Sequence, residues 1–198
     1  MIEARGIVAA TAADRSVIVQ TLADAFHDDP VFGWMVGDPA ARRVRMPRLF
    51  DVMYRVEQKY GGILKSATGK CASFWRPPGR AVTPTTEFLR RAWPLVHAFG
   101  PALPRLLAVS NAVEAHLPRD QPFWYAHFVG VSPSAQRQGW GAAMMRAGIA
   151  RARGQGVAVY LETARPENVS FYLGLGFEVI GEWDVPKGPH FWSMLHRP

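Results

Sequence analysis

The stretch "FWYAHFVGVSPSAQRQGWGAAMMRAGIARAR" (residues 123–153) decides the fold that we expect for this chain. Residues 123–131 are rich in aromatic and β-branched side chains and predict a strand, whereas apolar positions recur at helical spacing over residues 142–153. The loop between them carries two glycines one residue apart. A strand, a glycine-bearing loop and the start of a helix, in this order, are typical of an α/β or α+β domain.

The two glycines of the loop, Gly139 and Gly141, point to a phosphate-bearing ligand. A helix N-terminus presents unpaired N–H groups and a positive dipole end to phosphate oxygens, and glycine removes the side chain that would block the approach. A tight turn or close helix packing would explain the glycines equally well from the local pattern alone. The dinucleotide pattern would need a third glycine where Met144 stands, and the G-K-[ST] of a P-loop is absent.

Length and composition favour a single domain over residues 1–198. The hydrophobic fraction of 48% and the charged fraction of 20% are ordinary for a soluble globular protein. No apolar run reaches the length of a membrane span, and the N-terminus lacks a signal-peptide pattern. Cys71 is the only cysteine, which excludes an intramolecular disulfide and a cysteine-based metal site. We therefore expect a cytoplasmic protein without a metal.

The net charge of +7 raises the question of an anionic partner. The arginines are scattered, and only residues 41–48 form a basic cluster. A solvated helix face explains that cluster better than a nucleic-acid groove, because such grooves interleave basic residues with stacking aromatics. We expect neither a nucleic acid nor a membrane as partner, and a monomer or a homodimer.

The remaining patterns alternate between strands and helices and predict a mixed central β-sheet flanked by helices. Thr11 and Asp38 are expected to cap two helices. The expected strands are residues 3–10, 62–67, 70–76, 123–131, 157–163, 176–185 and 190–197, and the expected helices are residues 11–26, 38–58, two pieces within 84–117, 142–153 and 167–175.

The loop Gln136-Arg137-Gln138-Gly139-Trp140-Gly141 resembles the Q/R-x-x-G-x-G/A loop of the GNAT superfamily of acyl-CoA-dependent N-acyltransferases. A later segment, "ENVSFYLGLGFEVIG" (residues 167–181), resembles a second signature of the same family. The resemblance to the family core covers about residues 121–196. Over nearly the whole chain the sequence is also similar to bacterial proteins of the puromycin N-acetyltransferase type, with the weakest fit between about 77 and 118.

The resemblance implies that acetyl-CoA is the cosubstrate, bound where two parallel strands splay apart. Its pyrophosphate would lie on the loop amides, and its pantetheine would pair with the strand backbone at Val129 and Val131. Gly130 is expected to ease the local distortion. Arg137 either contacts a phosphate or is simply exposed. The residues expected to contact acyl-CoA are Val129, Gly130, Val131, Gln136, Arg137, Gln138, Gly139, Trp140, Gly141, Ala142, Asn168 and Tyr172.

Tyr172 is the expected general acid. Its reference pKa of about 10 exceeds the roughly 8.5 of a thiol, so the hydroxyl stays protonated and can donate to a departing thiolate. Asn168 lies four residues earlier, on the same helix face, and is expected to cap the helix, to contact coenzyme A, or both. Without the motif, Tyr172 would be read as a packing residue beside Phe171 and Phe177.

His127 and Glu162 are the two candidates for the general base. Strict alternation along the strand would place Tyr125, His127, Val129 and Val131 on one face. The similarity of this strand to arylalkylamine acetyltransferases favours His127, although a lone histidine on a strand is more often structural. Glu162 stands near the end of the next strand, where it would face the cleft, anchor a loop or bind a substrate ammonium.

The function that we expect is transfer of an acetyl group from acetyl-CoA to a primary amine of a small molecule, by direct attack in a ternary complex. The N-terminal helices, the middle helices and the last hairpin would recognise the substrate. The alternatives are a protein N-acetyltransferase for lysine or N-terminal amines, a noncatalytic acyl-CoA-binding protein and a nucleic-acid-binding module. Possible aromatic walls of the substrate pocket are Phe26, Phe32, Trp34, Trp75 and Trp124.

Overall fold

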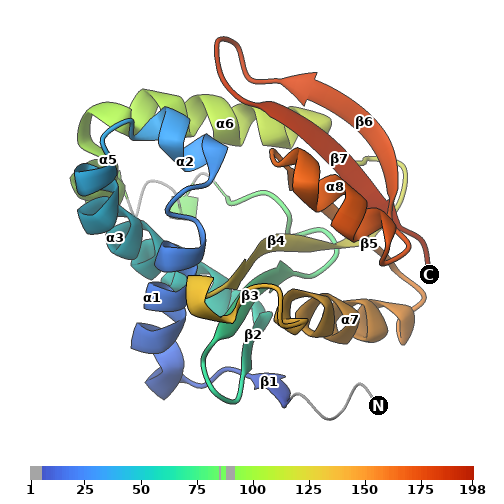
Figure 1. Cartoon of the computed structure of the whole chain (residues 1–198). Coiled ribbons are helices and arrows are strands. Elements are labelled where there is room, and N and C mark those ends of the chain that lie inside the picture. The colour runs from blue at the N-terminus through green and yellow to red at the C-terminus, as the bar shows by residue number, and fades with distance from the viewer. Residues whose placement is uncertain (1–5, 85, 88–91) are drawn as a thin grey trace.

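A computed structural model describes residues 6–84, 86–87 and 92–198, and all structural statements below refer to these residues. Seven strands form one sheet in the order β1-β2-β3-β4-β5-β7-β6. Figure 1 shows this sheet running from β1 near the N-terminus to the β6–β7 hairpin near the C-terminus. The strands are β1 Ile7–Ala9, β2 Ile63–Ser66, β3 Cys71–Arg76, β4 Phe123–Val131, β5 Ala158–Thr163, β6 Glu178–Asp184 and β7 His190–His196.

One pair of neighbouring strands, β4 and β5, is parallel, and the other pairs are antiparallel. This arrangement confirms the mixed α/β sheet expected from the sequence. The parallel pairing is short, because only Phe123–Tyr125 of β4 lie in register with Ala158–Tyr160 of β5. Beyond Tyr125 the two strands separate, as expected for the splayed pair, and this fork positions the site.

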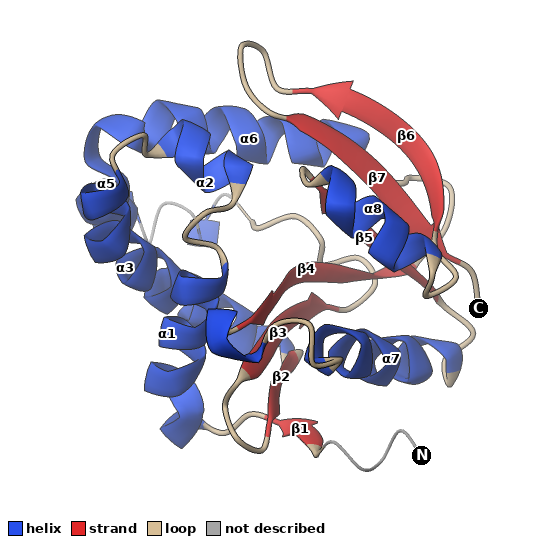
Figure 2. Cartoon of the chain, in the orientation of Figure 1, coloured by secondary structure: helices blue, strands red, loops and turns tan. Residues whose placement is uncertain are grey.

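The helices confirm most of the expected segments, and Figure 2 shows how they cover the sheet. Asp38 caps α3 as expected, with its side chain accepting hydrogen bonds from the backbone N–H groups of Ala40 and Ala41. The short helix α2 was not expected; it begins at Pro30 after the cap Asp29, whose carboxylate accepts a hydrogen bond from the Val31 N–H. The helices are α1 Arg15–Ala25, α2 Pro30–Met35, α3 Pro39–Glu57, α5 Ala92–Phe99, α6 Leu103–His116, α7 Trp140–Arg153 and α8 Pro166–Leu173.

Two large clusters of buried apolar residues lie around the sheet. The first joins α1, α2, α3, α5 and α6 to the sheet through residues such as Phe74. The second joins α7 to the sheet through residues such as Trp75 and Met145, and side chains of α8 pack against it. Gly148 of α7 is required by this packing, because a Cβ there would lie 2.1 Å from the ring of Trp75.

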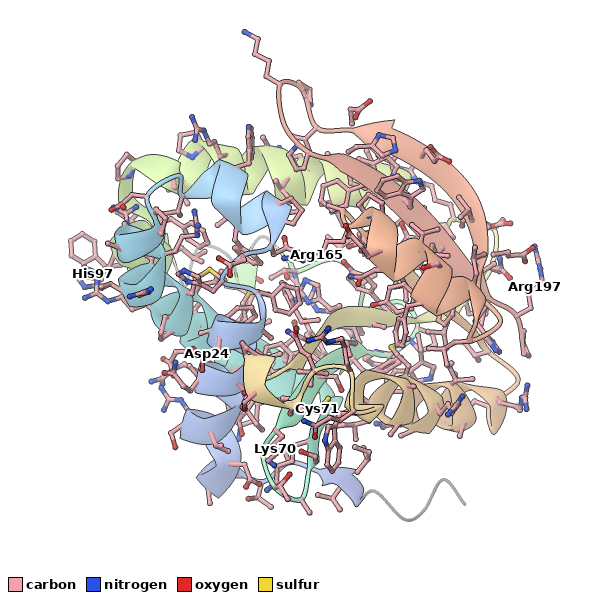
Figure 3. The ribbon with its side chains drawn as sticks, viewed as in Figure 1. Asp24, Lys70, Cys71, His97, Arg165 and Arg197 are labelled. Carbon is pink, nitrogen blue, oxygen red and sulfur yellow. The ribbon has the colours of Figure 1, made fainter. Side chains whose placement is uncertain are left out.

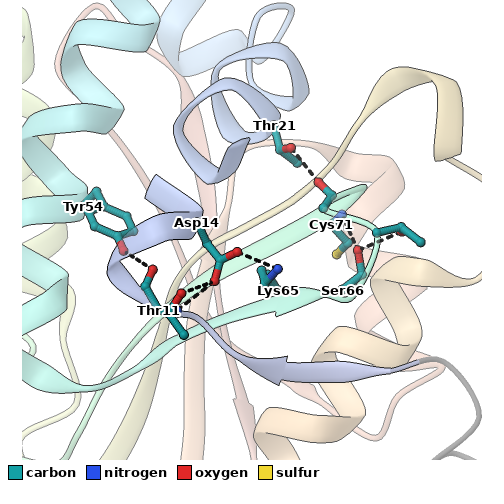
Figure 4. A network of polar contacts seen from close by, with 9 residues as sticks. Thr11, Asp14, Thr21, Tyr54, Lys65, Ser66 and Cys71 are labelled. Carbon is teal, nitrogen blue, oxygen red and sulfur yellow. Dashed lines mark hydrogen bonds and ion pairs between the residues drawn. The ribbon is translucent and has the colours of Figure 1, made fainter. Parts of the chain in front are cut away.

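Polar contacts fix the first helix to the β2–β3 hairpin (Figure 4). Asp14 at the start of α1 lies 2.7 Å from the ammonium of Lys65 in β2. The Tyr54 hydroxyl of α3 donates to the carbonyl of Thr11, and the Thr21 hydroxyl donates to the carbonyl of Gly69 in the hairpin turn. These contacts tie α1 to the β2–β3 hairpin and α3 to the segment before α1.

None of the described helices combines the length and the apolarity that a membrane span requires.

Candidate functional site

The candidate site is a cavity of about 480 Å³ beside the fork between β4 and β5. Three elements contribute the polar side chains that the sequence singled out. Tyr125 and His127 come from β4, Glu162 from β5, and Asn168 and Tyr172 from α8, and all five residues line the cavity. The expected acid and both expected bases are therefore brought together around one volume.

A β-bulge in β4 changes the faces that strict alternation predicted. Phe74 of β3 pairs with Phe128, but the next residue, Trp75, pairs with Ala126, so His127 is the extra residue of the bulge. His127 consequently turns toward α3, where it contacts Glu57. The expectation that His127 shares a face with Val129 and Val131 is therefore wrong.

The two valines instead turn toward α7. Val129 packs against the buried cluster that contains Met145 and Ile149 of α7. A Cβ built on Gly141, in the first turn of α7, would lie 3.7 Å from the side chain of Val131. The bulge thus separates the strand into a part that faces α3 and a part that faces α7 and the glycine loop.

Glu162 has the electrostatic properties of a base that works near neutral pH. One carboxylate oxygen accepts a hydrogen bond from the Tyr125 hydroxyl, and the other, Oε2, is buried with no hydrogen-bond partner among the described residues. Burial raises the pKa of Glu162 to about 7, although the hydrogen bond from Tyr125 and the charge of Arg76 oppose this shift. A carboxylate with such a pKa exchanges a proton readily at physiological pH.

His127 lies in a different environment. Its Nδ1 is 3.0 Å from Oε1 of Glu57, and its ring stacks on Tyr125 with 4.9 Å between the ring centres. Burial and the charge of Arg76 lower the pKa of His127 to about 4, against the effect of Glu57. The imidazole is therefore neutral at pH 7, and as a base it is much weaker than Glu162.

Tyr172 both packs against neighbouring aromatic rings and lines the cavity, so the two interpretations of the sequence are compatible. Its ring centre lies 5.1 Å from that of Phe171 and 5.6 Å from that of Phe177. The hydroxyl makes no hydrogen bond to another described residue. Burial raises the pKa of Tyr172, and the charges of Glu162 and Asp29 add to the shift. The hydroxyl therefore stays protonated and can donate a hydrogen bond into the cavity.

Asn168 does not cap its helix, so the capping alternative is wrong, whereas its contact with coenzyme A stays a prediction. The helix α8 begins at Pro166, and Arg165 occupies the capping position. Asn168 lies one turn before Tyr172, and its amide donates to the Thr163 hydroxyl over 3.3 Å. Arg165, labelled in Figure 3, lies at the start of α8. It ties α8 to the loop before α2, because it donates to the carbonyl of Asp28 and lies 3.5 Å from the Asp29 carboxylate.

The glycine loop has the backbone that its sequence predicted. Gly139 has φ +81° and caps α7, so only glycine fits there without strain, and Arg137 also lies in the left-handed region at φ +59°. Gly141 differs, because an added Cβ would meet nothing closer than 3.6 Å. Packing within the protein therefore does not require glycine at position 141, whereas the close approach of a ligand would.

Gly130 has a packing reason that the sequence did not reveal. A Cβ at this position would lie 2.8 Å from the side chain of Leu22 and 2.9 Å from that of Ala25, both on α1. The absence of a side chain thus allows α1 to lie directly on β4. Easing of the strand distortion is not needed to explain this glycine.

The donor set at the fork fits a bound acyl-CoA. The first turn of α7 leaves N–H groups without intrahelical acceptors beside Gly139, Gly141 and Ala142, which is the arrangement that binds phosphate oxygens. The edge of β4 from residue 126 to residue 131 has no strand paired with it on the β5 side among the described residues. A ligand with amides of its own can pair with that free edge, as a strand would.

The aromatic walls are only partly those expected. Phe26 and Phe32 line the cavity, whereas Trp34, Trp75 and Trp124 do not. The three indole N–H groups donate elsewhere within the protein, to Lys187, Ser73 and Gln155 respectively. Most of the remaining wall is apolar, and the helices α3, α5 and α6 contribute to it through Leu49, Val52, Met53, Val56, Leu95, Leu106, Val109 and Val113.

Sequence reasoning missed two buried charged residues next to the site, Glu57 and Arg76. Arg76 ends β3 and donates to Oε1 of Glu57 from Nε, at 2.8 Å, and from Nη2, at 2.6 Å. Neither residue belongs to a motif. Fifty-one positions from Arg76, His127 joins the same carboxylate oxygen, so only the fold brings the three together.

Comparisons with known proteins agree with this geometry. Residues 90–177 match the acetyltransferase (GNAT) family. An uncharacterized N-acetyltransferase of Schizosaccharomyces pombe is 26% identical over 176 residues, which cover 84% of this chain and 71% of that protein. A Corynebacterium glutamicum structure, described as histone acetyltransferase HPA2 and related acetyltransferase, has a TM-score of 0.67 and 25% identity, covering 98% of this chain and 96% of that one.

Arylalkylamine N-acetyltransferase 2 of Aedes aegypti is 10% identical and has a TM-score of 0.68, with 96% of this chain and 97% of that chain covered. At this identity the likeness concerns the fold. The protein has the mixed α/β GNAT fold, and the family match supports a GNAT acetyltransferase.

Proposed function

We propose that this protein transfers an acetyl group from acetyl-CoA to a primary amine of a small molecule. The observation that carries the proposal is the pairing of Glu162, whose pKa burial raises to about 7, with the protonated hydroxyl of Tyr172 on the same cavity. Acyl transfer to an amine requires one group that takes a proton and another that gives one. Both are present beside the glycine loop and the free edge of β4.

Acetyl-CoA supplies the thioester whose carbonyl carbon the amine attacks. Glu162 takes a proton from the substrate ammonium, which gives the nitrogen a free electron pair. As the C–N bond forms and the C–S bond breaks, Tyr172 donates its proton to the departing sulfur. The second proton that the nitrogen loses restores the hydroxyl, and Glu162 releases the first proton to solvent. A direct attack in a ternary complex needs no covalent intermediate on the protein.

The shape of the cavity favours a small molecule over a polypeptide. Its volume of about 480 Å³ lies within the range of ligand pockets, about 300–1,000 Å³. The helices α3, α5 and α6 provide much of its apolar wall, so that a bound amine would sit against side chains such as Met53 and Leu106. A peptide substrate would instead need an open groove through which its chain could pass.

The cavity lies between the fork of β4 and β5 and the helices α3, α5 and α6. This arrangement supports a single domain in which the fork carries the chemistry and these helices recognise the substrate. Although the C. glutamicum structure is described as a histone acetyltransferase, the limited volume and the apolar wall of the cavity favour small amines over that alternative. A similarity to the puromycin N-acetyltransferase type is a further prediction from the sequence, and it leaves the identity of the amine open. We also propose a cytoplasmic location.

The nucleic-acid alternative loses support from the basic cluster at residues 41–48. Arg42 is buried and donates to the carbonyls of Val36 and Gly37, and Arg45 donates to the carbonyl of Phe99. Two of the four arginines in this cluster are thus used within the fold and are not presented as a basic face.

Titration of the purified protein with acetyl-CoA in a calorimeter tests the proposal, with Gly141→Ala as the variant. An alanine fits the protein at this position, so its unfolding temperature should change little, while a methyl group in the phosphate site should weaken binding by tenfold or more. Gly37→Ala is the matched control, because a Cβ there meets nothing within 4 Å. Absence of saturable binding to the wild type, or of thiol release with any of a panel of primary amines, would refute the proposed activity.

A further inference from the structure

A buried ion pair lies directly behind His127, outside the groups that the proposed chemistry uses. The carboxylate of Glu57 is fully buried and Arg76 is 2% exposed. Arg76 places two N–H donors on Oε1 of Glu57, at 2.6 and 2.8 Å, and a third on the carbonyl of Ala81 at 2.7 Å. Burial of two charges is expensive, and apolar residues of similar volume would often stabilise a core equally well. A contribution to stability therefore does not by itself explain why the Glu57–Arg76 pair is present.

The contacts of Glu57 supply that explanation. Its Oε1 accepts hydrogen bonds from Arg76 and from His127, whose Nδ1 lies 3.0 Å away, while its Oε2 has no partner among the described residues. A neutral imidazole carries one proton, and the hydrogen bond made by one nitrogen decides which nitrogen holds it. An ionised carboxylate can only accept, so the proton must lie on Nδ1. The other nitrogen, Nε2, is then left with a free electron pair.

His127 lines the cavity while its Nδ1 contacts Glu57, and this combination places Nε2 toward the cavity. His127 is the extra residue of the bulge, and its ring stacks on Tyr125 and lies tilted against Phe128. Arg76 meanwhile neutralises Glu57, so the carboxylate can orient the ring without turning it into an imidazolium. We propose that Glu57 and Arg76 are positioning residues that fix His127 as the Nδ1–H tautomer, with Nε2 accepting a hydrogen bond from the acceptor amine.

This inference rests on the proposed function for the role of the amine, but not for the tautomer. It also divides the work between the two candidate bases of the sequence analysis. Glu162 takes the proton from the substrate amine. His127 holds the amine nitrogen in position for attack on the thioester carbonyl, because Nε2 accepts a hydrogen bond from the amine. The carboxylate, the guanidinium and the imidazole come from α3, β3 and β4, so the arrangement depends on the packing of α3 against the sheet.

Nitrogen-15 NMR of histidine-labelled protein tests the tautomer without any need for activity. The chain has six histidines, and a His127→Gln spectrum assigns the signals of His127. We expect Nδ1 protonated and Nε2 unprotonated in the wild type at pH 7. In Glu57→Leu, which removes the acceptor, the two tautomers should mix. An Nε2–H tautomer in the wild type would overturn the proposal, as would a Glu57→Leu spectrum in which His127 is unchanged.

Steady-state kinetics test the role in positioning. Relative to Glu57→Gln, which retains an acceptor and should keep most of the activity, we expect Glu57→Leu to lower kcat/KM for the amine about tenfold while the affinity for acetyl-CoA is unchanged. Adding His127→Gln to Glu57→Leu should cause less loss than the product of the two single effects, because both act on one interaction. Full multiplication of the two effects would overturn the proposal.

Asp184→Asn is the matched control, since Asp184 contacts the exposed His190 through Nδ1 at 2.9 Å on the β6–β7 hairpin. It should alter the His190 signals and leave the His127 signals unchanged. The expected tautomer in a protein that acetylates no amine would support the positioning of His127 by Glu57 and would count against the proposed function alone.

Discussion

Glu162→Gln should make the protein a worse enzyme and, above pH 7, a relatively more stable one. Wild-type Glu162 carries a buried carboxylate oxygen without a partner among the described residues, and burial raises its pKa from 4.5 to about 7. A shift of about 2.5 pH units corresponds to about 3 kcal/mol, at roughly 1.36 kcal/mol per unit. That free energy opposes folding in full only above about pH 7, where the carboxylate is ionised in both states.

The sign of the pH dependence follows from the raised pKa. Below pH 4.5 the folded and unfolded carboxyl groups are both protonated, and the substitution changes no charge. Between pH 4.5 and pH 7 the unfolded wild type loses its proton first, so the wild-type free energy of unfolding falls relative to that of the variant. Above pH 7 the free energy of unfolding of the variant exceeds that of the wild type by the full amount of about 3 kcal/mol. For a chain of this size, that difference corresponds to roughly 6–12 °C in unfolding temperature.

Chemical denaturation of both proteins at pH 4.5 and pH 8 measures this difference, and fixed effects of the amide cancel between the two pH values. In parallel, kcat of the variant should fall by about 10²–10⁴, and the acidic limb of the wild-type profile of kcat/KM should titrate near pH 7. Glu178→Gln is the control, because Glu178 is exposed and pairs with Arg197. Equal stability differences at both pH values, or retained turnover, would refute the assignment of Glu162 as the base.

Two further substitutions test the acid and the packing beneath the site. Tyr172→Phe should lower kcat by about tenfold or more with unchanged calorimetric affinity for acetyl-CoA, since the hydroxyl makes no hydrogen bond to another described residue and its loss leaves the ring packing intact; unchanged turnover would remove Tyr172 from the chemical step. Gly148→Ala should destabilise the fold by about 1–3 kcal/mol, because its Cβ would overlap the ring of Trp75 at 2.1 Å; an unfolding midpoint like that of the wild type would show that α7 can shift away from the sheet.

Local patterns predicted the parts of the fold whose causes are local. The cap at Asp38, the hairpin around Gly69 and the strand, loop and helix of residues 123–153 each follow from adjacent residues, and each is present in the structure. The helix α2 was missed because its six residues contain only a proline start and too few apolar repeats to show a period. Asn168 was misplaced by one turn because a proline two positions earlier begins the helix.

The bulge at His127 shows where sequence reasoning stops. Nothing in residues 123–131 indicates that Phe74 and Trp75 of β3 pair with residues two apart on β4, because the bulge belongs to the strand pair and not to one strand. The same limit hid Glu57 and Arg76. A buried salt bridge between a helix end and a strand end has no sequence spacing of its own, so only the packing of α3 on β3 reveals it.

The residues proposed to transfer protons and the residues proposed to contact the amine lie on different elements of the fold. Glu162 and Tyr172 lie on β5 and α8, whose positions depend on the β5–β7 pairing and on the contacts of Arg165. The apolar wall lies on α3, α5 and α6, which contribute none of the groups proposed to move protons. Substitutions at wall residues such as Met53 or Leu106 can therefore change the shape of the amine that fits without moving the acid or the base. With the proposed function, the identity of the amine would then be decided by a few side chains on these helices.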